Sequence, residues 1–210
     1  MARGRFITFE GGEGAGKSTQ LRRLAERLTQ AGVEVVATRE PGGSPGAESI
    51  RDLLVNGDAD RWSGLSEALL MYAARRDHIE RTITPALDRG AWVVCDRFAD
   101  STRAYQGAGG GVDPALISAL ESHVLSVRPD LTLILDLPAD AGLARAGGRG
   151  GGEARFESKG LGFHERLRQA FLTIADAEPE RCVVIDGRDE IAAVGEAVWD
   201  SVRTRLLDRG

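Results

Sequence analysis

The sequence predicts an α/β fold in which a five-stranded parallel sheet is covered by helices on both faces. Five short apolar runs rich in β-branched residues alternate with helical patterns along the 210-residue chain. Runs that are apolar on both faces are typical of parallel strands buried between helices. The predicted strands are residues 6–9, 33–37, 91–95, 131–135 and 182–185.

The connection after the first strand carries a phosphate-binding pattern. Gly11, four intervening residues and Gly16-Lys17-Ser18 lie between that strand and an amphipathic run. Polyphosphate is held by backbone N–H groups that converge from one side, and a Cβ at the glycine positions would block this approach. Lys17 can reach the phosphates as a point charge, and Ser18 can offer its hydroxyl to Mg²⁺. The pattern predicts a polyphosphate-binding loop formed by Gly11, Gly12, Glu13, Gly14, Ala15, Gly16, Lys17, Ser18 and Thr19.

The next elements follow from apolar spacing and from breakers. A helix should run from the loop to about residue 30, and the second strand should end in a loop at 38–46, which holds two prolines and three glycines. Further helices are expected at about 47–54 and from about 66 toward 87, the second interrupted or bent by Pro85.

The long helix carries several charged residues. Met71, Arg75 and His78 are spaced four and three apart, so they should share one face. Spacing alone favours a solvated surface for Arg75 and for the neighbouring Arg76.

The third strand leads directly into Asp96-Arg97. A carboxylate at the carboxyl end of a strand beside a phosphate loop can hold Mg²⁺ or its waters. Arg97 can grip a phosphate through two hydrogen bonds. An ordinary surface pair of Asp96 and Arg97 is the alternative interpretation.

A glycine-rich stretch follows the fourth strand. Residues 145–157 contain five glycines and three arginines between two helical patterns. A mobile solvated loop is one interpretation, and a lid that closes over polyphosphate is the other.

Composition limits the classes of protein and of partner. The length suits a single domain, and the net charge of −5 argues against a general nucleic-acid or membrane binder. Cys95 and Cys182 lie far apart without metal-ligand spacing, so buried free thiols are expected. No apolar run approaches the roughly 20 residues of a membrane span, and a soluble, cytoplasmic protein is therefore expected.

Four segments in this order resemble bacterial thymidylate kinases over nearly the whole chain: residues 9–19, 38–43, 95–98 and 104–107. The resemblance implies a nucleoside monophosphate kinase with the three-layer P-loop NTPase fold. Residues 1–210 would form one domain with a short arginine-containing lid at about 145–157. The implied reaction transfers the γ-phosphoryl group of ATP to dTMP, giving ADP and dTDP, with Mg²⁺, on a homodimer.

The resemblance also implies roles for acceptor-site residues. Glu13 would face the 3′-hydroxyl of the deoxyribose, and Arg75 would hydrogen-bond the thymine carbonyl. Tyr105 would lie against C2′ and disfavour a ribonucleotide. A phosphate clamp would be formed by Arg97 with Arg51 and Arg39. The remaining residues of the implied dTMP site are Glu40, Pro41, Met71, Thr102 and Gln106.

The resemblance also implies the catalytic residues, and the sequence differs from the usual family pattern at two places. Gly14 lies where eukaryotic-type enzymes have an arginine, so the lid should supply the catalytic arginine, with Arg149 as first choice and Arg155 as second. Met71 lies where the family usually stacks phenylalanine on thymine, and the lid holds more glycines and fewer arginines than expected. The other implied catalytic residues are Lys17, Asp96 and Arg97, with Ser18 and Asp96 at the metal.

Three alternative functions stay open from the sequence. They are a kinase for another nucleoside monophosphate, a nucleotide-binding regulator without transfer activity, and a GTPase switch. The sequence lacks the Asn-Lys-x-Asp motif that reads guanine, which argues against the last.

Overall fold

The computed structural model describes residues 3–58, 60–147 and 159–208. Its five parallel strands form one sheet in the order β2-β3-β1-β4-β5. Every predicted apolar run is a strand, which confirms the predicted sheet. The strands are β1 (Phe6–Glu10), β2 (Val35–Arg39), β3 (Trp92–Asp96), β4 (Leu131–Asp136) and β5 (Cys182–Asp186).

Burial differs between the inner and outer strands. β1 is wholly buried and β3 and β4 are nearly so, whereas β2 and β5 are partly exposed. The expectation that all five strands are covered on both faces therefore holds for the inner strands only. An edge strand has a neighbouring strand on one side alone, which leaves part of it open.

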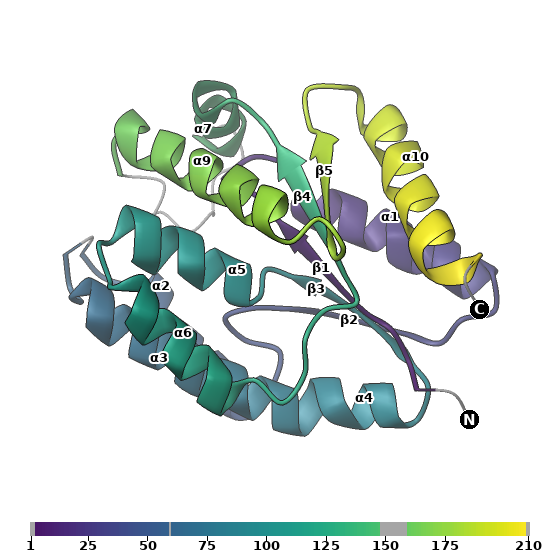
Figure 1. Ribbon diagram of the computed structural model, residues 1–210, viewed down its shortest axis with the longest axis horizontal. Coiled ribbons are helices and arrows are strands. Elements are labelled where there is room, and N and C mark those ends of the chain that lie inside the picture. Colours follow the sequence, from purple (N-terminus) through teal and green to yellow (C-terminus); the bar gives the residue numbers. More distant parts are fainter. Residues whose placement is uncertain (1–2, 59, 148–158, 209–210) are drawn as a thin grey trace.

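Helices cover the two faces of the sheet (Figure 1). On one face, α1 (Lys17–Gln30) and α10 (Ile191–Val202) pack Leu24, Leu28 and Val198 against inner-strand residues. The other face is covered by α4 (Thr84–Asp88) and α9 (Leu161–Ala177). Phe98 belongs to the apolar cluster that α4 forms with this face. The remaining helices are α2 (Pro45–Val55), α3 (Gly64–His78), α5 (Ala99–Thr102), α6 (Pro114–Val124) and α7 (Ala139–Gly147).

The predicted long helix is α3 and α4 joined by a π-helical segment, Ile79–Ile83. The amide of Thr84 donates to the carbonyl of Ile79, five residues back. Proline has no amide hydrogen and its ring clashes with the carbonyl four residues back. The change of helical type therefore comes just before Pro85. A second π-helical segment, Arg103–Gly109, extends α5.

The carboxyl ends of the parallel strands meet at one edge of the sheet, where open α/β sheets bind their ligands. β3 and β4 lie on opposite sides of β1. The loop after β1 is thus at the centre of this edge, with the segment after β3 beside it. Among the described helices, none is long and apolar enough to cross a membrane.

Candidate active site

The phosphate loop, residues 11–16, joins β1 to α1. Lys17 opens the helix, and its ammonium donates to the carbonyls of Gly11 at 3.1 Å and Gly12 at 2.8 Å. Burial, followed by the nearby Arg97, lowers the pKa of Lys17. The lysine therefore lies folded over the loop, and an anion there would gain from its partly desolvated charge.

Position 14 of the loop accepts no residue larger than glycine. It has a φ of 67°, in the left-handed region, and a Cβ would overlap the carbonyl oxygen of Gly142 in α7. In turn, a Cβ on Gly142 would overlap the carbonyl oxygen of Glu13. The loop and α7 thus approach each other as bare backbones, so an arginine at position 14 would not fit this packing.

Ser18 and Asp96 meet beside the loop. The Ser18 hydroxyl donates to Asp96 Oδ2 at 2.6 Å, and Asp96 Oδ1 is buried without a hydrogen-bond partner among the described atoms. Within the described ranges, no cluster of three or more His, Cys, Asp or Glu side chains could hold a metal ion. Mg²⁺ in nucleotide sites uses one or two protein oxygens and completes its shell with phosphates and water. The hydroxyl and the unpartnered carboxylate oxygen fit that need.

Arg97 lies between the phosphate loop and the acceptor side. It is the one non-glycine residue with positive φ in the described part of the chain, at 68°. Its guanidinium donates to Glu13 Oε1 at 2.8 Å and to the Gly11 carbonyl at 3.1 Å, and lies 4.8 Å from the centre of the Tyr105 ring. These contacts fix a nearly buried cation at the edge of the phosphate loop.

Glu13 is held by Arg97 and by Tyr105. Its Oε1 also accepts from the Tyr105 hydroxyl at 2.6 Å. Burial raises the pKa of Glu13, but Arg97, Lys17 and the Tyr105 hydrogen bond outweigh it and lower the pKa to about 2. Glu13 is therefore ionised at neutral pH. Tyr105 contributes a hydroxyl as well as the aromatic surface expected from the sequence.

A pocket opens between the loop after β2, α3 and α5. Eight of the predicted acceptor residues line it, together with two that the sequence did not single out, Phe98 and Ser101. The pocket therefore gathers residues from three separate segments, 40–41, 71–75 and 97–106. The eight are Glu40, Pro41, Met71, Arg75, Arg97, Thr102, Tyr105 and Gln106.

Arg75 contradicts the expectation of a solvated surface. It is only 2% exposed, and it donates to Glu40 Oε2 at 2.7 Å, to the Thr102 hydroxyl and to the Phe98 carbonyl. The neighbouring Arg76 does lie at the surface. The expectation was wrong for Arg75 because two successive helical residues point about 100° apart.

Three predicted acceptor residues do not line the pocket. Arg51 donates to the Pro41 carbonyl at 2.8 Å and so supports the pocket wall. Arg39 is exposed and pairs with Glu48 on α2, away from the pocket lining. Glu13 reaches the pocket through Arg97 and Tyr105.

A second cavity of about 860 Å³ lies on the other side of the phosphate loop. It runs from Gly14 and Gly16 to the segment after β5 and the start of α10, and Arg145 closes one side by donating to the Gly187 carbonyl at 3.0 Å. No residues could be assigned from the sequence to contact the adenine base of ATP. The only signal in the sequence was that Asp186-Gly187 follows the last predicted strand, 182–185, at the end of a parallel strand where such sheets bind ligands.

Two predicted residues have no place in this description. Arg149 and Arg155, the expected lid arginines, lie outside the described residues, as does most of the expected lid.

Cys95 and Cys182 are both buried and free, as predicted.

Comparison with known proteins agrees with this geometry. The family model for thymidylate kinase matches residues 9–198. A thymidylate kinase from Caulobacter vibrioides is 69% identical, covering 98% of this chain and 99% of the relative. One from a Bradyrhizobium strain is 55% identical over 98% and 92%. A crystal structure of thymidylate kinase from Ehrlichia chaffeensis superposes with a TM-score of 0.78 at 40% identity, over 96% of this chain and 99% of the other. The chain belongs to the thymidylate kinase family.

Proposed function

We propose that this protein transfers the γ-phosphoryl group of ATP to dTMP, giving ADP and dTDP. One observation carries the proposal: the Gly11 carbonyl accepts from Lys17 Nζ and from Arg97 Nη1, each at 3.1 Å. Lys17 belongs to the polyphosphate loop and Arg97 to the acceptor pocket. Two cations on one carbonyl bring a donor phosphate and an acceptor phosphate close enough for direct transfer.

The residues divide the work of phosphoryl transfer, which needs positioning and charge stabilisation more than covalent chemistry. Lys17 balances charge on the donor phosphates, and Arg97 holds the acceptor phosphate. Ser18 and Asp96 would hold Mg²⁺, which when bound with ATP neutralises phosphate charge. Glu13, kept ionised by Arg97, accepts a hydrogen bond from the sugar hydroxyl.

The acceptor pocket supports a deoxyribonucleotide with a pyrimidine base. Arg75 lines the pocket and is held in one orientation by Glu40 and Thr102. Gln106 is oriented by Glu67, to which its amide donates at 3.1 Å. Met71 lies in the pocket wall, where its thioether can cover a ring face.

The proposal has four further parts. The homodimer and the lid arginine come from the family resemblance, whereas the single domain and the cytoplasmic location were also expected from length and composition. Residues 1–210 act as one domain, two copies form a homodimer, and the enzyme works in the cytoplasm. A lid arginine, Arg149 or Arg155, completes the charge stabilisation.

An acceptor panel tests the function. Purified protein is given ATP, Mg²⁺ and one monophosphate at a time, and ADP is followed by a coupled assay. We expect the highest kcat/KM with dTMP. dUMP should be about 10- to 200-fold poorer, because one methyl group in an apolar pocket contributes about 1–3 kcal/mol. Equal values for dTMP and dUMP would refute the assigned specificity, and a higher value for another monophosphate would favour the alternative kinase.

A further inference from the structure

Glu10 is a buried carboxylate for which the mechanism above has no role. It is the last residue of β1, directly before the phosphate loop, and it is completely buried. Its Oε1 accepts from the Phe98 amide at 2.7 Å, and its Oε2 accepts from the Ser101 hydroxyl at 2.6 Å. Phe98 and Ser101 lie 88 and 91 residues further along the chain. Glu10 therefore ties the end of β1 to the start of α5.

Arg97 directly precedes the first of these attachment points, Phe98. Its amide donates to the Phe9 carbonyl at 2.9 Å, and the next amide, that of Phe98, donates to Glu10. The left-handed conformation of a non-glycine residue such as Arg97 costs free energy and persists only where its surroundings fix it. The Phe9 carbonyl and the Glu10 side chain thus hold the two amides that flank Arg97.

Ser101 extends the link to the side chain. Its hydroxyl donates to Glu10 and accepts from Arg97 Nη1 at 3.3 Å. Arg97 Nη2 is meanwhile fixed by Glu13. The guanidinium is therefore oriented by Glu13, by the Gly11 carbonyl and by Ser101, and Ser101 is itself held by Glu10.

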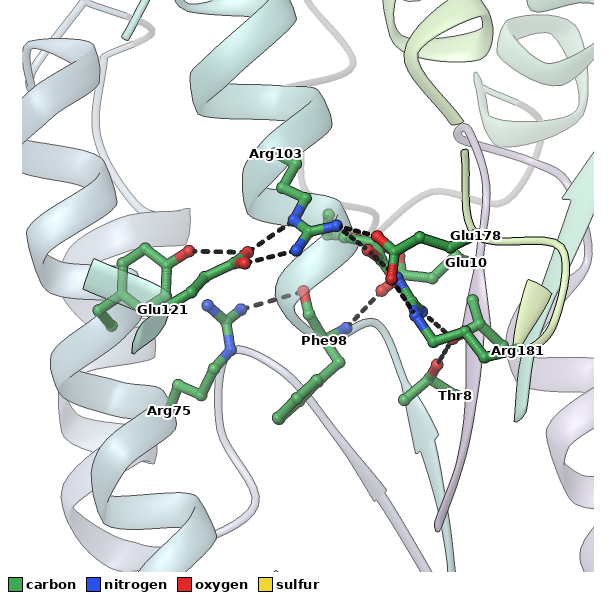
Figure 2. Close-up of polar contacts among 12 residues, drawn as sticks. Thr8, Glu10, Arg75, Phe98, Arg103, Glu121, Glu178 and Arg181 are labelled. Carbon is green, nitrogen blue, oxygen red and sulfur yellow. Dashed lines mark hydrogen bonds and ion pairs between the residues drawn. The ribbon is translucent and has the colours of Figure 1, made fainter. Parts of the chain in front are cut away.

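A partly buried charge network holds α5 beside this attachment (Figure 2). Asp100, the neighbour of Ser101, receives two hydrogen bonds from Arg181, at 2.7 and 2.8 Å. Arg103 bridges Glu121 of α6 and Glu178, which follows α9. Burial, reinforced by Asp100, raises the pKa of Glu10 to about 8. Burying a carboxyl group is costly unless it is hydrogen-bonded, and the bonds from Ser101 and Phe98 offset part of that cost.

We propose that Glu10 is a positioning residue, which holds Phe98 and Ser101 so that Arg97 presents its guanidinium to the acceptor phosphate. This inference rests on the proposed function, in which Arg97 grips that phosphate. Glu10 itself touches neither substrate.

The test compares three variants. Glu10→Met fills the space but accepts no hydrogen bond, whereas Glu10→Gln can accept from the Phe98 amide and can donate to the Ser101 oxygen. Thr8→Val is the matched control: Thr8 is equally buried in β1 and its hydroxyl pairs with Thr132 instead. We expect Glu10→Met to raise KM for dTMP and the calorimetric Kd of dTMP about tenfold, with KM for ATP within twofold. Glu10→Gln should recover to within threefold, and Thr8→Val should match the wild type.

A second background separates positioning from general loss of structure. In Arg97→Lys, the bidentate grip is already lost, so adding Glu10→Met should not lower kcat/KM for dTMP further. If Glu10→Met does not fold, Ser101→Ala takes its place, because it removes the link to the guanidinium. Since Ser101 also lines the pocket, its increase in KM for dTMP supports the inference only if it disappears in the Arg97→Lys background, and an increase that persists there contradicts it. Equal increases in KM for both substrates, additive losses with Arg97→Lys, or failure of Glu10→Gln to recover would overturn the inference.

The calorimetric arm distinguishes this inference from the proposed function. If the wild-type protein binds dTMP without transferring phosphate, the proposed function fails, and the tenfold change in Kd still tests Glu10. If the protein turns over dTMP normally and Glu10→Met has no selective effect, the inference alone fails.

Discussion

Removal of the buried negative charge at Glu40 should strongly destabilise the protein. Arg75 and Glu40 have side chains only 2% and 3% exposed, and the Nε of Arg75 lies 2.7 Å from Glu40 Oε2. His78 also contacts Glu40, at 2.9 Å. Glu40→Gln keeps the volume and one acceptor but leaves the arginine charge without its counter-ion. An arginine cannot lose its proton to escape this cost.

The expected magnitude comes from burial. Breaking a buried ion pair by removing one partner costs about 3–5 kcal/mol. Because glutamine still accepts a hydrogen bond, we expect about 3 kcal/mol. For a chain of this size that corresponds to a fall in Tm of roughly 6–12 °C. The matched control is Glu80→Gln, since Glu80 pairs with the adjacent Arg76 where both side chains are about half exposed, at 54% and 46%. That pair should contribute under about 1 kcal/mol.

Urea unfolding followed by circular dichroism and tryptophan fluorescence measures both variants. The midpoint should fall for Glu40→Gln at an unchanged m value, which marks a change of stability alone. If Glu40→Gln and Glu80→Gln lost the same small amount, burial would not control the strength of these pairs and the reasoning would be refuted.

Three other predictions follow from the site. The folded pKa of Glu13, about 2, lies below the ordinary value of 4.5; its ionisation therefore stabilises the protein above about pH 4.5, and up to about 3 kcal/mol is lost as the pH falls toward 2. Unfolding of the wild type and of Glu13→Gln at pH 3 and 6 should show a smaller pH dependence in the variant. Gly14→Ala should lose more than about 2 kcal/mol, through positive φ and overlap with α7, while Gly12→Ala, with open space around it, should lose less; equal losses in thermal melts would contradict this packing. Arg149→Ala should lower kcat by about 10³-fold or more with little change in KM for ATP, and normal turnover in steady-state assays would remove it from catalysis.

Local patterns determined much of the fold. Hydrophobic periodicity, the glycine and proline residues that end helices and strands, and runs of β-branched residues are all properties of short segments. The five strands and the helix after the phosphate loop could therefore be predicted from the sequence. The glycine spacing likewise identified the polyphosphate loop. Ser18 and Asp96 could be proposed for one metal site because Ser18 closes the phosphate-loop pattern and Asp96 ends a predicted strand beside that loop.

Contacts between distant segments were decided only by the tertiary structure. Helical spacing alone treated Arg75 and Arg76 alike, although the family resemblance singled out Arg75. The packing of α3 against the loop after β2 buried Arg75 and left Arg76 exposed. It grouped Arg39 with the phosphate clamp, but β2 is an edge strand and Arg39 pairs with Glu48 on α2. Glu10 looked like the end of an apolar run, yet it holds residues about 90 positions away. Composition and spacing record which side chains are present along the chain, whereas burial and the choice of partner depend on which segments the folded sheet brings together.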